Sequence, residues 1–62
     1  MVTMRQVLHD ERAFITAYAD ARQRGDFRQI RAWREELDNI IASPATSRRD
    51  KDAAKEHYNH MS

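Results

Sequence analysis

The sequence contains no cysteine and only one glycine and one proline among its 62 residues. Without cysteine, the chain can have no disulfide, no thiolate metal ligand and no cysteine nucleophile. One glycine and one proline are too few for the repeated turns of an all-β fold. A single glycine also argues against a glycine-rich phosphate-binding loop. The sequence therefore predicts an all-α protein.

Long apolar runs and a large net charge are missing as well. No apolar segment approaches the ~18 residues of a membrane span, and no signal peptide opens the chain, so we expect a cytoplasmic protein with no membrane partner. Eleven basic and ten acidic side chains leave a formal net charge of +1. This balance excludes a strongly basic histone-like protein and an acidic mimic of nucleic acid.

Two segments with helical patterning are present, separated by helix breakers. Thr3 begins a capping-box pattern, which predicts a first helix over about 4–24. Gly25 suits the left-handed position just after a helix, and Asp26 suits the N-cap of a second helix over about 27–42.

In both segments the apolar residues recur with a period of 3.6, so each helix has one apolar face. The apolar residues of the first segment are Met4, Val7, Leu8, Phe14, Ile15 and Tyr18, and those of the second are Phe27, Ile30, Trp33, Leu37, Ile40 and Ile41. Two such helices joined by a short turn are expected to fold back as an antiparallel hairpin, with Tyr18 near Trp33 and Phe14 near Leu37.

The chain is expected to be a single small helical domain over 1–62, with a hairpin over 3–42 and a linker over 43–46. The tail over 47–62 has a thin apolar stripe, and Ser47 suits the N-cap of a helix within it. We expect a short C-terminal helix that docks weakly on the hairpin.

A hairpin of this size buries only part of each apolar face, and the tail is too polar to cover the rest. We therefore expect a homodimer that forms a four-helix-type bundle, or a permanent protein partner. Glu11 lies within the first apolar stripe. Its carboxylate is expected either at the edge of the stripe, paired with an arginine, or in a polar contact that aligns the dimer.

Charge is distributed unevenly around the predicted turn. Residues 22–34 hold five arginines and one aspartate, a net charge of +4, and the next eight residues carry −3. Arginine suits phosphates and carboxylates equally well. The basic residues are either a solvated rim, neutralised by pairs such as Arg31–Glu35 and Arg34–Asp38, or a contact site for an acidic protein or nucleic acid. The candidate contacts are Arg22, Arg24, Arg28, Arg31 and Arg34.

Trp33 is a further candidate contact, because tryptophan beside arginine is common in interface hot spots. The interpretation that we favour for Trp33 is a place at the edge of the core, packed against the facing helix. The spacing of His57 and His60 fits two ligands of a metal, but solvated histidines are the expectation so near the end of this sequence. No pattern of nucleophile, base and orienting acid is present.

The sequence thus favours a small non-enzymatic regulatory or adaptor protein with no cofactor, no metal and no small-molecule substrate. Its expected partners are a second copy of itself, another protein, or both. The alternative is a small nucleic-acid-binding protein that contacts phosphates through the arginines near the turn.

Overall fold

The computed structural model describes residues 3–61, which form four α-helices and no strand. The helices are α1 (Met4–Val7), α2 (Glu11–Arg24), α3 (Phe27–Ala42) and α4 (Arg48–Met61). Positions 1, 2 and 62 of the predicted domain lie outside the described residues. The all-α prediction is confirmed for the described part of the chain.

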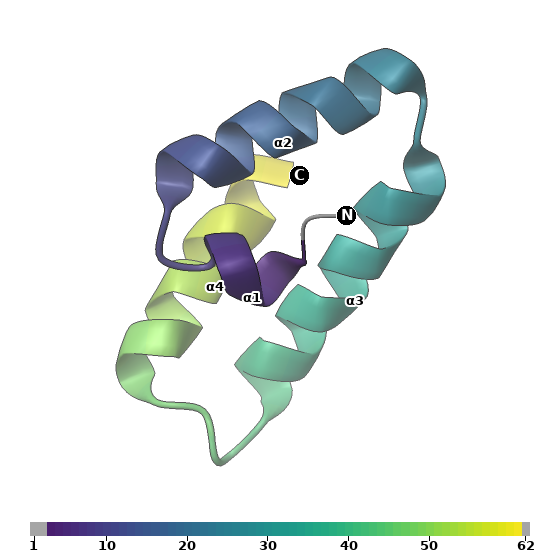
Figure 1. The fold of residues 1–62 in the computed structure, drawn as a ribbon. Coiled ribbons are helices and arrows are strands. Elements are labelled where there is room, and N and C mark those ends of the chain that lie inside the picture. The colour runs from purple at the N-terminus through teal and green to yellow at the C-terminus, as the bar shows by residue number, and fades with distance from the viewer. Residues whose placement is uncertain (1–2, 62) are drawn as a thin grey trace.

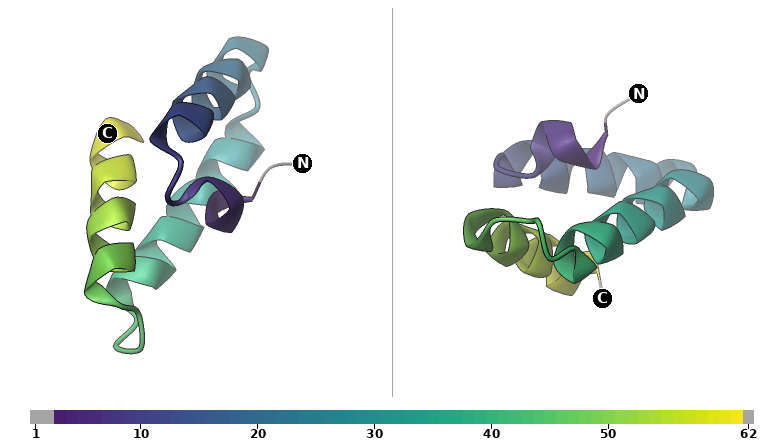
Figure 2. Two further views of the ribbon diagram at one scale, coloured as in Figure 1. Left: turned by 60° about the vertical axis from the view of Figure 1, so that its left-hand side comes forward. Right: turned by 90° about the horizontal axis from the view of Figure 1, so that it is seen from below.

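The helices lie in two layers, with α1 and α2 on one side and α3 and α4 on the other (Figure 2). After a short connection, α4 runs back beside α3, while α2 lies across the far end of this pair (Figure 1). The core between the layers contains Met4, Phe14, Trp33, Leu37 and Ala54, each no more than 2% exposed.

The turn between α2 and α3 has the local structure that the sequence predicts. Gly25 adopts a left-handed conformation with φ of 70°, and its backbone N–H points at the carbonyls of Ala21 and Arg22. The carboxylate of Asp26 accepts a hydrogen bond of 3.2 Å from the backbone N–H of Gln29. The predicted bounds of the second helix, 27–42, are confirmed.

The N-terminus of α4 also has its predicted cap. The hydroxyl of Ser47 accepts a hydrogen bond of 3.2 Å from the backbone N–H of Asp50. The helix is not weakly docked, however, because Ala54, His57 and Met61 are all buried against the rest of the molecule. The mainly polar composition of the tail did not indicate this burial. Ala54, His57 and Met61 nevertheless recur at helical spacing and form a buried stripe.

The prediction of one continuous helix over 4–24 is wrong, because the chain turns at Leu8 and His9. Asp10 begins a new helix, and its carboxylate accepts a hydrogen bond of 3.1 Å from the backbone N–H of Ala13. The break separates the short α1 from α2. It allows the backbone N–H of Met4 to donate to the carboxylate of Glu36 on α3, at 3.0 Å.

His57 joins this break to α4. The Nε2 atom of its buried ring lies 2.9 Å from the carbonyl oxygen of Leu8 and 3.2 Å from that of Val7. Carbonyl oxygens only accept, so Nε2 carries a proton and donates to both. The ring also stacks on Phe14, with the ring centroids 4.2 Å apart. The expectation of a solvated histidine is therefore wrong for His57.

Apart from Ile15 and Phe27, the large apolar residues of α2 and α3 are buried or partly buried within one chain, which removes the reason we gave for a four-helix dimer. The large apolar side chains that stay exposed among the described residues are Ile15, at 38%, and Phe27, at 73%. A homodimer stays a prediction, and any dimer has to use a surface other than the core faces of the two helices.

We expect Gly25→Ala to lower the free energy of unfolding by about 1–2 kcal/mol, because a side chain at positive φ is strained. An added Cβ has no neighbour within 4 Å, so the cost comes from the backbone conformation and not from a clash. Gly25→Asn is the control and should cost less, since asparagine tolerates this conformation. Urea denaturation followed by circular dichroism measures both, and equal costs would contradict the backbone explanation.

We expect His57→Phe to lower the free energy of unfolding by about 1–3 kcal/mol. Phenylalanine keeps an aromatic ring beside Phe14 but leaves the buried carbonyls of Val7 and Leu8 without the imidazole donor. The matched control is His60→Phe, one turn along α4, which is exposed and should change stability by less than about 0.5 kcal/mol. If the two variants unfold at the same urea concentration, His57 does not hold the break in place.

Candidate functional site

The arginines near the turn are brought to the surface by the last turn of α2 and the first half of α3. All five are exposed, and we call them the arginine tip: Arg22, Arg24, Arg28, Arg31 and Arg34. Their backbone positions follow from the Gly25–Asp26 turn, which ends one helix and starts the next. The N-terminus of α3 adds the positive end of a helix dipole to the same region.

Two arginines of the tip have local partners. Arg24 donates to the carboxylate of Asp20 at 2.9 Å, and a second nitrogen lies 4.0 Å from Asp26. The guanidinium of Arg22 lies 5.7 Å from the centroid of the Tyr18 ring, in a cation–π contact. The charge of Arg22 is thus placed on an aromatic face without being neutralised.

The arginines on α3 keep their charge at the surface. The expected pairs Arg31–Glu35 and Arg34–Asp38 are not among the ion pairs of the described residues. Arg34 instead donates to the backbone carbonyl of Met61 at 3.4 Å, which satisfies the end of α4. The interpretation of a neutralised rim therefore holds for Arg24 but not for these two residues.

Phe27 was expected in the apolar stripe of the second helix, and the structure corrects this. At 73% exposed, the ring lies outside the core. Phe27 is four residues before Arg31 and seven before Arg34, so it shares their face of α3 and not the face of Trp33 and Leu37. We call this surface the Phe27 face; the residues that line its depression are Phe27, Ile30, Arg31, Arg34, Glu35 and Asp38.

Trp33 and Glu11 do not take the contact and dimer-aligning roles, and Trp33 lies in the core, as its other interpretation expected. Trp33 is 2% exposed and packs against Phe14, with ring centroids 6.1 Å apart, so it is a core residue and not an accessible contact. Glu11 is exposed at the first position of α2, because Asp10 restarts the helix and changes its phase. There its charge is favourably placed at a helix N-terminus, and no buried carboxylate needs a partner.

Contacts within the fold account for the positions of His9 and His60. The Nε2 atom of His9 lies 2.6 Å from the carboxylate of Asp50, which links the turn after α1 to α4. His60 is exposed and places its ring edge-on to Phe14 and Tyr18. Within residues 3–61, no three histidine, aspartate or glutamate side chains are grouped so that they could hold a metal ion.

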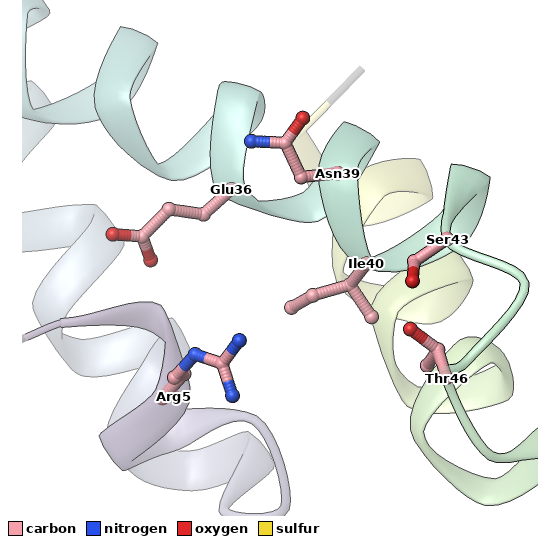
Figure 3. A pocket seen from close by; sticks show the side chains of 6 residues that line it. All are labelled: Arg5, Glu36, Asn39, Ile40, Ser43 and Thr46. Carbon is pink, nitrogen blue, oxygen red and sulfur yellow. The ribbon is translucent and has the colours of Figure 1, made fainter.

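A second depression lies between α1 and the end of α3 (Figure 3). It is lined by Arg5, Glu36, Asn39, Ile40, Ser43 and Thr46. Arg5 and Glu36 approach it from opposite walls (Figure 3). One of these side chains is basic and the other is acidic. The carboxylate of Glu36 is already bound to the backbone N–H of Met4. This depression therefore gives no preference for an anion or a cation.

Comparisons with protein-family models, curated proteins and solved structures give no match for this chain. In the part that the structure describes, no helix has the length and apolar character needed to cross a membrane. The surface chemistry of the arginine tip and the Phe27 face is therefore the basis on which function can be argued.

The exposure of Phe27 predicts that its side chain contributes little to folding. We expect Phe27→Ser to change the free energy of unfolding by less than about 0.5 kcal/mol. Phe14→Ser, the same substitution at a fully buried ring, should cost at least about 3 kcal/mol. Thermal and urea unfolding of the two variants checks this, and a large loss for Phe27→Ser would place its ring in the core.

Proposed function

We propose that this chain is a small non-enzymatic regulatory or adaptor protein of the cytoplasm, which binds another protein through the Phe27 face. The observation that carries this proposal is a largely exposed phenylalanine beside two arginines that have no carboxylate partner among the described residues. Aromatic side chains and arginine are enriched at protein interfaces, and truncating them there causes some of the largest losses of binding free energy.

The stability of the monomer does not account for this surface. A ring that is 73% exposed contributes little to the core. In the part of the chain that the structure describes, Arg31 and Arg34 form no ion pair that would stabilise α3. A partner that covers the ring and supplies carboxylates would give both features a use.

The absence of enzymatic activity is part of the proposal. Within residues 3–61, the one buried titratable side chain is His57, which is 4% exposed and donates to two backbone carbonyls. The depressions on the surface of the described residues are shallow, whereas catalysis usually needs a site that excludes water.

Nucleic acid is the second candidate partner, and the exposed positions of Arg22, Arg24 and Arg28 favour it. Phosphate contacts of this kind are strongly weakened by salt. The carboxylates of Glu35 and Asp38 lie on the same face as Arg31, and they would repel a phosphate backbone that extended along α3. For this reason we place protein binding first.

We expect the immobilised chain to retain a defined set of proteins from native lysate, and Phe27→Ser to lose that set. The matched control is Ile15→Ser, which removes the second large apolar side chain that is exposed among residues 3–61, on α2. It should retain the set, because it leaves the Phe27 face intact. Quantitative mass spectrometry of the retained proteins measures the difference.

Nuclease treatment and salt separate the two candidate partners. Protein binding through an apolar ring should survive both nuclease and moderate ionic strength. Retention that vanishes after nuclease treatment, and that Arg24→Ala with Arg28→Ala abolishes, would replace the protein-binding proposal with the nucleic-acid one.

A further inference from the structure

The depression between α1 and the end of α3 contains two opposite charges that face it without pairing. The guanidinium of Arg5 extends into it from α1, and the carboxylate of Glu36 lies on the opposite wall, on α3 (Figure 3). Within residues 3–61, no ion pair joins these two side chains. A molecule that enters the depression can therefore interact with both charges.

The start of α1 positions both charged groups. The Oε2 atom of Glu36 accepts the hydrogen bond of 3.0 Å from the backbone N–H of Met4, which holds the carboxylate at the first residue of α1. Arg5 is the next residue of the same helix. Among the described residues, neither the Oε1 atom of Glu36 nor the guanidinium of Arg5 has a hydrogen-bond partner. One acceptor and one set of donors thus stay available to a ligand.

An apolar side chain and two hydroxyl groups complete the lining. Ile40 is partly buried and lies between Glu36 and the two hydroxyl groups, which belong to Ser43 and Thr46 and point towards one another (Figure 3). The Oγ atom of Ser43 accepts a hydrogen bond of 3.3 Å from the backbone N–H of Ala45, so its own proton remains available for donation. The depression has a volume of about 320 Å³, which is at the lower end of the range for small-molecule sites.

We infer that this depression binds a small zwitterion, a molecule that has one carboxylate and one ammonium group on an apolar body. The ammonium group donates to Oε1 of Glu36. The carboxylate lies on the side of Arg5 and the two hydroxyl groups, which supply donors, and the apolar body packs on Ile40.

The opposite signs of the two walls are the reason for choosing this class of ligand. A ligand with a single charge meets a like charge as well as an opposite one, and the two effects offset each other. A zwitterion meets the opposite charge at each end. The site shares no residue with the Phe27 face, so the inference does not depend on the proposed function.

Backbone amide shifts in two-dimensional NMR of the full chain test the site, because they report binding at individual residues. The probes are L-leucine and ε-aminocaproic acid, which carry the same two charges at a short and a long separation. We expect at least one probe to shift the amides of Arg5, Ile40 and Thr46, with a millimolar Kd because exposed ion pairs contribute little free energy. If neither probe shifts these amides at about 50 mM, the inference is overturned.

Derivatives with one charge are the ligand controls, measured at equal ionic strength. For each probe, the N-acetyl derivative lacks the ammonium group and the amide derivative lacks the carboxylate. Each derivative should bind at least threefold more weakly than the zwitterion from which it is made. Derivatives that bind as tightly as the zwitterion would show that the apolar body alone is recognised, and this outcome contradicts the inference.

Arg5→Gln tests the carboxylate end of the site. It removes the charge of an exposed side chain, and it should weaken binding of the zwitterion at least threefold. The amide derivative, which is a cation, should bind this variant at least as tightly as it binds the wild type. Arg12→Gln is the matched control, because it makes the same change at an exposed position on α2, and it should leave every affinity unchanged. Equal effects of the two substitutions would indicate a general effect of charge and would overturn the site.

Glu36→Gln tests the ammonium end in the same way. Glutamine keeps an oxygen for the backbone N–H of Met4 but removes the negative charge. Zwitterion binding should fall at least threefold, whereas the N-acetyl derivative, which is an anion, should bind at least as tightly as it binds the wild type. Circular dichroism checks the fold of this variant. If the substitution loosens α1, the comparison of Arg5→Gln with Arg12→Gln decides the question by itself.

Discussion

The architecture depends on the two hydrogen bonds that His57 donates to the carbonyls of Val7 and Leu8. Where the chain leaves α1, both carbonyls lie inside the molecule, where an unpaired acceptor is costly. The carbonyl of Val7 also accepts a hydrogen bond of 3.1 Å from the backbone N–H of Asp10. The imidazole satisfies both carbonyls from a helix that begins 40 residues later in the sequence. One side chain thereby fixes the break in the N-terminal segment and the position of α4 together.

The core is assembled around the same imidazole. Phe14 stacks on His57 and contacts both Tyr18 and Trp33, so residues from α2, α3 and α4 meet at one ring. The hydroxyl of Tyr18 lies 3.5 Å from the carbonyl of Met61, where Arg34 also donates. The last turn of α4 is therefore bound by both neighbouring helices. This accounts for the burial of a tail whose composition is mainly polar.

Signals between neighbouring residues allowed part of this fold to be predicted. Features that depend on partners distant in the sequence could not be predicted. The left-handed glycine at 25 and the cap at Asp26 depend on neighbouring residues, which the sequence contains. Asp10 is an equally good cap, but the apolar period continues across it and favoured one long helix. The role of His57 depends on that break, so it could not be inferred while the break was missed. Phe27 was placed in the core because it is apolar, although its spacing assigns it to the face of Arg31 and Arg34.

The proposed function rests on the contrast between the two sides of α3. On the inner side, Trp33 and Leu37 are buried and the carboxylate of Glu36 binds the start of α1. On the outer side, Phe27 stays 73% exposed and the arginines do not pair with the carboxylates one turn away. Folding needs only that the outer side be polar, and many sequences would meet that condition without an exposed aromatic ring. The proposal of a protein partner rests on this arrangement of both charge signs around the ring, since exposed charges in water interact weakly and the ring gains nothing from solvent.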